Sequence, residues 1–121
     1  MSEAMAYSDD QARDKLQAGL AQWSVKDGHL YREFTCNGWR ASMMLANGIA
    51  HLAEITWHHP ELRVNWGGVS IALRTHSDDA ITDKDFELAG MIEQFAAWKP
   101  GPTSALEGAP DDGSWRYIDR R

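Results

Sequence analysis

Three of the five histidines of this 121-residue chain lie close together in the sequence. His58 and His59 are adjacent and are followed by Pro60, and His76 comes sixteen residues after that proline. Imidazole gains and loses a proton near neutral pH, so a cluster of imidazoles can place a proton donor and a proton acceptor around one small molecule. A lone histidine is more often structural, but an adjacent pair with a third nearby favours acid–base chemistry.

Two acidic residues are placed where they could act on these imidazoles. Glu54 precedes His58 by four residues on a predicted helix, so both side chains project from one helix face; the alternative is an exposed ion pair without a role in the site. Asp85 lies three residues before Leu88, on the apolar stripe of another predicted helix, where an uncompensated carboxylate is unfavourable. It either caps that helix together with Thr82 or points into a pocket shared with the histidines, and both explanations can hold at once.

Three amphipathic helices should position these groups. Ser8 and Gln11 form a capping-box pattern at the start of the first helix. Asn37 can cap the second, and the proline after the histidine pair ends that helix near His58. The third opens at Thr82 and carries its apolar residues on one face. The first helix is predicted over residues 9–23, the second from 37 to about 58, and the third from 82 onward.

Four strands are predicted in two hairpins. The turn Lys26-Asp27-Gly28 separates strands over 23–25 and 30–35, and Gly67-Gly68 joins strands over 63–66 and 69–75. These strands place His76 just past a strand end. The order α-β-β-α-β-β-α predicts an α+β fold, with a four-stranded antiparallel sheet covered on one face by three helices.

The composition changes at Lys99, after which three of the four prolines and several glycines follow. We expect residues 1–98 to form one domain and residues 99–121 to form a Pro/Gly-rich C-terminal tail. This tail either docks through Trp115, Tyr117 and Ile118 or stays mobile.

The charge and composition argue against several other classes of function. Eighteen acidic and twelve basic residues give a net charge of −6, and no basic cluster alternates with aromatic residues, so nucleic acid is not an expected partner. No apolar run approaches the ~20 residues of a membrane span, and a single cysteine, Cys36, fits a reducing compartment, so we expect a cytoplasmic protein. We find neither a metal-ligand spacing nor an activated nucleophile and expect no metal or cofactor.

The centre of the chain resembles the signature of the pterin-4a-carbinolamine dehydratase family. The matching pattern is Glu54-x3-His58-His59-Pro60-x5-Trp66-x9-His76-x8-Asp85. The order of helices and strands from about Ser8 to Trp98 is similar to the family's as well. The resemblance implies a lyase that dehydrates 4a-hydroxytetrahydropterin (4a-hydroxytetrahydrobiopterin) to quinonoid dihydropterin and water. Such an enzyme recycles the cofactor of aromatic amino-acid hydroxylases.

The resemblance also assigns roles to individual residues. It implies that His58 and His59 form the acid–base pair and that His76 is their partner and contacts the pterin. Glu54 and Asp85 would tune and orient these imidazoles. Pro60, Thr75 and Ser77 are further expected pocket neighbours, and Trp66 is either a wall of the pocket or part of the packing on the sheet.

Family members associate as dimers or tetramers, so the resemblance implies a homodimer or homotetramer. Six tryptophans in so short a chain fit this expectation, because some of them could line a subunit interface. Two other functions stay open. One is a non-catalytic pterin-binding, assembly or regulatory protein that keeps the same fold, and the other is a metal-dependent hydrolase.

Overall fold

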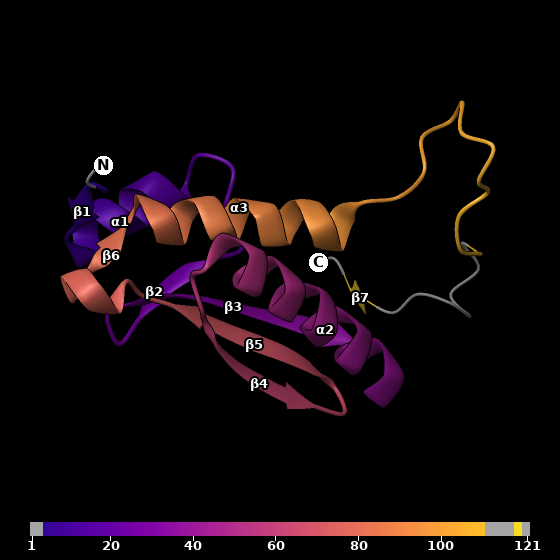
Figure 1. The fold of residues 1–121 in the computed structure, drawn as a ribbon, viewed down its shortest axis with the longest axis horizontal. Helices are drawn as coiled ribbons and strands as arrows, with labels where there is room; N and C mark the ends of the chain where they lie inside the picture. Colours follow the sequence, from indigo (N-terminus) through magenta and orange to yellow (C-terminus); the bar gives the residue numbers. More distant parts are fainter. Residues whose placement is uncertain (1–3, 111–117, 120–121) are drawn as a thin grey trace.

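Three helices and an antiparallel sheet form the fold, and the computed structural model describes residues 4–110 and 118–119 (Figure 1). The predicted order α-β-β-α-β-β-α is confirmed, with two short strands added near the N-terminus and the third helix, and one near the C-terminus. In chain order the elements are β1 (Ala6–Tyr7), α1 (Asp9–Leu16), β2 (Ser24–Lys26), β3 (His29–Cys36), α2 (Trp39–Thr56), β4 (Glu61–Asn65), β5 (Gly68–Leu73), a 3-10 turn (His76–Asp78), β6 (Ile81–Thr82), α3 (Asp83–Ala97) and β7 (Ile118–Asp119).

The main sheet has the strand order β2-β3-β5-β4, and α2 and α3 lie on the same side of it in Figure 1. Alternate residues of each strand point toward the helices; they are buried in the central strands β3 and β5 and half-buried in the edge strands β2 and β4, which is the period-two pattern of a sheet covered on one face. The strands and helices together bury Leu16, Trp23, Leu30, Phe34, Leu45, Ile49, Val69, Ile71, Leu73, Leu88 and Ile92. The opposite face of the sheet carries mainly polar side chains.

The first helix is shorter than predicted. The capping box of Ser8 and Gln11 is present, but α1 ends at Leu16 rather than near Trp23. Gly19 adopts a φ of 97°, which ends the helical geometry. Trp23 is nevertheless buried, because the chain turns back on itself after the helix and its backbone N–H donates to the carbonyl of Leu20.

The hairpin between β4 and β5 turns one residue earlier than predicted. Trp66 and Gly67 form the two-residue turn, because Asn65 pairs with Gly68. Gly68 belongs to the strand, where its Cα faces the neighbouring strand so closely that a Cβ would lie 2.1 Å from the carbonyl oxygen of Phe34. The glycine is therefore needed for a close backbone approach and not for the turn.

The second helix differs from the prediction at both ends. Its N-cap is Gly38, with a φ of 103°, and not Asn37. At its C-terminus Trp57 adopts left-handed geometry with a φ of 54°, and the helix stops at Thr56. His58 therefore lies outside the helix, in the segment that leads to β4.

The third helix begins as predicted, with a complete capping box formed by Thr82 and Asp85. A two-stranded sheet that the sequence pattern did not predict holds this start in place. In it, Tyr7 of β1 pairs with Ile81 of β6, and the Tyr7 hydroxyl donates to the carboxylate of Asp83.

The chain after α3 makes a long excursion away from the other elements (Figure 1). It then returns as β7, which pairs with the end of β3 through Thr35 opposite Asp119. The sequence pattern did not predict a strand here, but docking of the tail at Ile118 was one of its two alternatives, and Ile118 pairs with Cys36. Trp115 and Tyr117 lie outside the described residues, so the division at residue 98 stays a prediction. Among the helices in the described ranges, none is long and apolar enough to cross a membrane.

Candidate active site

His58 and Asp85 form the most enclosed ion pair of the predicted site. The Nε2 of His58 lies 2.6 Å from Oδ1 of Asp85, and the Asp85 side chain is 0% exposed. The imidazole is 15% exposed, so one edge of the ring still reaches solvent. Asp85 reaches the histidine from the first turn of α3, whereas His58 follows the C-terminus of α2.

The Asp85 oxygen that does not contact His58 is held by hydrogen bonds from Thr75 and Thr82. Oδ2 of Asp85 accepts from the Thr82 backbone N–H and from the Thr75 hydroxyl, both at 2.9 Å. The hydroxyls of Thr75 and Thr82 lie 2.7 Å apart, and the Thr82 oxygen accepts from the Lys84 N–H. Thr75 and Thr82 are both buried. The network explains how a carboxylate can lie on the apolar face of α3: each of its oxygens has a hydrogen-bond partner.

This network fixes which nitrogen of His58 carries a proton. The carboxylate of Asp85 can only accept hydrogen bonds, so Nε2 of His58 must be the donor in their contact. In neutral His58 the lone pair then belongs to Nδ1. The buried carboxylate therefore orients the ring and directs its proton-accepting nitrogen away from α3.

His59 has a second carboxylate partner in a more open setting. Its Nε2 lies 2.9 Å from Oε1 of Glu54, and the two side chains are 51% and 67% exposed. The ring of Trp57 packs edge-on against the imidazole, with the ring centroids 5.0 Å apart. His59 is thus the more exposed of the two imidazoles.

The predicted pairing of Glu54 with His58 is wrong. That prediction required His58 to continue the helix, so that the two side chains would share one helix face. The left-handed residue Trp57 ends the helix first, and Glu54 contacts His59 instead. Each adjacent histidine therefore has its own carboxylate, one buried and one exposed.

His76 lies next to the buried network through the chain, because it directly follows Thr75. It opens the 3-10 turn His76–Asp78 and is exposed, as is Ser77, whose hydroxyl donates to the carboxylate of Asp78. Pro60 is half-buried and directly precedes β4.

Arg74 anchors this turn and was not predicted. Its guanidinium donates to the carbonyl oxygens of Gly28 and Asp79, each at 2.6 Å, and so ties the turn to the β2–β3 hairpin. No distinctive motif surrounds this arginine in the sequence, and its partners are backbone carbonyls, which a sequence pattern does not reveal.

Trp66 is not brought to the histidines within one chain. It lies in the β4–β5 turn, 68% exposed, beside Gly38. The site lies beyond the other end of β5, which is five residue steps or about 17 Å from that turn. A role for Trp66 in the pocket of the same chain is therefore not supported by its position.

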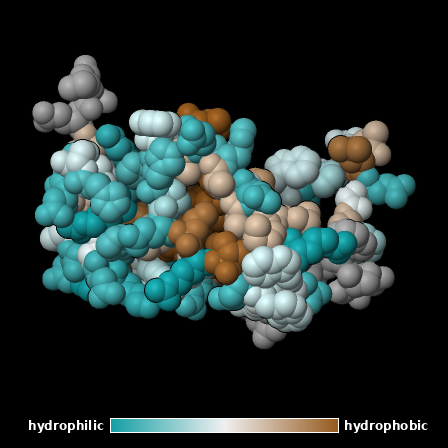
Figure 2. Space-filling view, turned by 60° about the horizontal axis from the view of Figure 1, so that its bottom comes forward, coloured by the Kyte–Doolittle hydropathy of each residue, from teal (hydrophilic) through white to brown (hydrophobic). Residues whose placement is uncertain are grey.

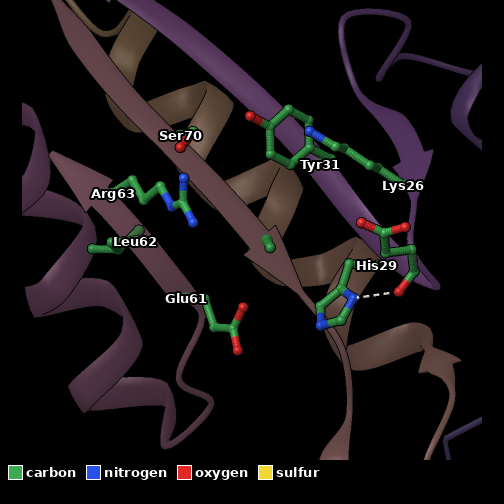
Figure 3. A pocket seen from close by; sticks show the side chains of 9 residues that line it. Lys26, His29, Tyr31, Glu61, Leu62, Arg63 and Ser70 are labelled. Atoms are coloured by element: carbon green, nitrogen blue, oxygen red, sulfur yellow. Dashed lines mark hydrogen bonds between the residues drawn. The ribbon is translucent and has the colours of Figure 1, made fainter. Parts of the chain in front are cut away.

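A hollow of about 230 Å³ opens on the polar face of the sheet (Figure 3). Its lining includes Glu61, two residues after His59, together with Arg63, His29 and Tyr31. The sequence pattern did not single out these residues. Only the alternation along β4, which puts Glu61 and Arg63 on the face away from the helices, could have indicated them.

Within the described ranges, no group of three or more histidine, cysteine or acidic side chains is arranged to hold an ion. Cys36 is buried, and burial raises the pKa of its thiol. This thiol is therefore poorly suited to act as a nucleophile.

Comparisons with known proteins agree with these observations. A sequence profile described as Pterin 4 alpha carbinolamine dehydratase matches residues 5–95. A relative in Aquifex aeolicus is 33% identical over 88 residues, which cover 73% of this chain and 88% of that protein. A relative in Rickettsia canadensis is 39% identical over 82 residues, which cover 66% of this chain and 75% of that protein. Both carry the name "Putative pterin-4-alpha-carbinolamine dehydratase".

A solved structure resembles the fold. The crystal structure of a transcriptional coactivator/pterin dehydratase from Brucella melitensis matches with a TM-score of 0.67 and 24% sequence identity, over 74% of this chain and 96% of that one. At this identity the likeness supports the fold alone, whereas the profile and the relatives support the family. The chain belongs to the pterin 4 alpha carbinolamine dehydratase family, a family of hydro-lyases.

Proposed function

We propose that this protein dehydrates 4a-hydroxytetrahydropterin to quinonoid dihydropterin and water by histidine acid–base catalysis. The observation that carries the proposal is the pair of histidine–carboxylate contacts, His58 with Asp85 and His59 with Glu54. Each contact occupies Nε2 of its imidazole and leaves Nδ1 for a substrate. Dehydration needs one proton donor and one proton acceptor on the same small molecule, and two imidazoles can supply both.

The different surroundings of the two imidazoles suggest their roles. His58 is held by a buried carboxylate that stabilises the imidazolium, so its Nδ1 accepts the proton from N5 of the pterin. His59 is half-exposed and recovers protons from solvent, so its imidazolium donates to the departing 4a-hydroxyl. The C4a–O bond breaks as the N5 electrons form the C4a=N5 double bond, and water leaves. His76, at the edge of the site, would contact the pterin ring.

Alanine variants test this assignment. His58→Ala and His59→Ala should each lower the dehydration rate of enzymatically generated carbinolamine by about 10²-fold, the usual share of general acid–base catalysis. His51→Ala is the matched control, because His51 is exposed on α2, outside the two carboxylate pairs. Full activity in a variant lacking both His58 and His59 would rule out their catalytic role.

We also place the protein beside an aromatic amino-acid hydroxylase in the cytoplasm, where it would return the spent pterin to the reducing enzyme. A coupled assay tests this link. Added protein should shorten the lifetime of the carbinolamine released by a hydroxylase, and the doubly substituted histidine variant should not. An unchanged lifetime with the unmodified protein would contradict both the link and the activity.

The protein should also assemble into a homo-oligomer. Four of the five tryptophans in the described residues are exposed, and α2 adds exposed Met44 and Ile55. Figure 2 shows apolar surface gathered in the middle of one face, with hydrophilic residues around it. Apolar surface of this kind is commonly covered in a symmetric assembly. Light scattering should give the mass of a dimer or tetramer, and a monomeric mass would refute the assembly.

A further inference from the structure

The hollow on the open face of the sheet has a floor of small side chains and walls of larger ones. Ala72 and Ser70 of the central strand β5 form the floor. Ala72 pairs with Glu61 of β4 on one side and with Tyr31 of β3 on the other. A small residue between two large ones in the same cross-strand row leaves room above it. The volume, about 230 Å³, suits a single bicyclic ring better than a larger ligand.

Two charged side chains beside this floor, Glu61 and Arg63, are not neutralised by an ion pair with any described residue, although His29 contacts the carbonyl oxygen of Asp27 at 2.8 Å. In Figure 3, Glu61 and Arg63 extend from β4 over the hollow, and His29 faces them from β3. Within the part of the chain that the structure describes, neither Glu61 nor Arg63 makes an ion pair within 4.0 Å. By contrast, Glu33 on the same face accepts the hydroxyl of Tyr31 at 2.6 Å. The Glu61 carboxylate is thus available to a ligand.

The hollow carries both an acidic and a basic side chain, Glu61 and Arg63, and this combination restricts the kind of ligand that fits it. A simple anion would be attracted by Arg63 and repelled by Glu61 at the same site. A 2-amino-4-oxo pyrimidine ring presents two parallel N–H donors, from N3 and the 2-amino group, with acceptor atoms on either side. A carboxylate matches the two donors with two oxygens, in the manner of bidentate pairing, while neighbouring cationic groups can donate to the acceptors.

The hollow and the histidine pair are neighbours along the chain. Glu61 follows His59 by two residues, a span of at most about 7 Å between their Cα atoms. We propose that Glu61 is the residue that recognises the 2-amino-4-oxo edge of the pterin, with the ring lying over Ala72 and its C4a–N5 side toward the histidines. This inference rests on the proposed function for the orientation of the ring, but the recognition itself can be tested without turnover.

Binding of two stable ring compounds tests the role of Glu61. Pterin carries the 2-amino group, whereas lumazine, its 2,4-dioxo analogue, has an oxygen in its place. The unmodified protein should bind pterin about 10-fold to 100-fold more tightly than lumazine, the range expected for hydrogen bonds to a charged group. Glu61→Gln should lose most of this preference. Glu33→Gln is the matched control and should keep it, and circular dichroism checks that both variants fold.

The outcomes separate this inference from the catalytic one. Equal binding of pterin and lumazine by the unmodified protein, or an unchanged preference in Glu61→Gln, would overturn the role of Glu61. A Glu61-dependent preference in a protein that does not dehydrate the carbinolamine would support recognition and reject the activity. Active protein with no such preference would support the activity and reject the recognition.

Discussion

Replacing Asp85 by asparagine should change the proton position on His58 while leaving the fold largely intact. The carboxamide oxygen can keep the two bonds that Oδ2 makes at 2.9 Å, from the Thr82 N–H and the Thr75 hydroxyl. The amide NH2 group then faces Nε2 of His58, which Oδ1 contacted at 2.6 Å. Because that group donates, Nε2 must accept, and the proton of the neutral ring moves to Nδ1.

The expected magnitudes follow from these contacts. All three hydrogen bonds of the Asp85 carboxylate become bonds to a neutral amide, and the free energy of unfolding should fall by about 1.5–3 kcal/mol. Catalysis loses both the required tautomer and the charge that stabilises the imidazolium of His58. We expect kcat to fall by about 10²-fold to 10⁴-fold, since loss of a carboxylate behind a catalytic imidazole reaches the upper figure.

Two measurements decide between a functional and a purely structural Asp85. Long-range 15N–1H spectra should show the His58 proton on Nε2 in the unmodified protein and on Nδ1 in Asp85→Asn. Asp83→Asn is the control, since Asp83 lies in the same helical turn but bonds to Tyr7 and Met5. If Asp85→Asn melts at a lower temperature but keeps full kcat and the Nε2 proton, the carboxylate is only a helix cap.

The other predictions concern stability. Gly68→Ala should lower the melting temperature, because the new Cβ would lie 2.1 Å from the Phe34 carbonyl oxygen. Gly90→Ala in α3 meets nothing within 4 Å and should raise the melting temperature, because alanine adds up to about 1 kcal/mol of helix propensity to the free energy of unfolding. The hydrogen bond to Asp83, together with burial, raises the pKa of Tyr7 to about 12. The stability that Tyr7 adds is therefore present below about pH 10 and lost as the pH rises toward 12, and melting curves of Tyr7→Phe should lack that loss. The hydrogen bond from the Tyr7 hydroxyl also lowers the pKa of Asp83, so the stability that Asp83 adds is present above about pH 4 and is lost in acid. If the melting temperature of Tyr7→Phe depends on pH in acid and alkali as that of the unmodified protein does, the pairing is contradicted.

Local signals in the sequence predicted the elements well. The capping boxes at Ser8 and Thr82 depend on residues three positions apart, and both are present in the structure. The place of Asp85 was also predictable, because an acidic residue on an apolar stripe needs a partner. Its two expected roles, cap and partner of a histidine, are both found in the geometry.

Features set by the tertiary structure were not predictable in the same way. Glu54 contacts His59 and not His58 because Trp57 ends the helix in a left-handed conformation, which a bulky residue rarely adopts. The distance of Trp66 from the histidines depends on which end of the β4–β5 hairpin carries it. The position of Glu61 at the edge of the hollow depends on the strand register that pairs it with Ala72.

The first turn of α3 can report on the condition of the site through hydrogen exchange. The Thr82 N–H is bound by the same Asp85 oxygen that holds Thr75, so this amide can exchange with deuterium only when the carboxylate releases it. Its protection therefore measures how often the buried partner of His58 is lost by local opening. Ligand that binds only to the closed arrangement should slow exchange at Thr82 in proportion to its occupancy. One backbone amide would then follow the integrity of the site in the absence of turnover.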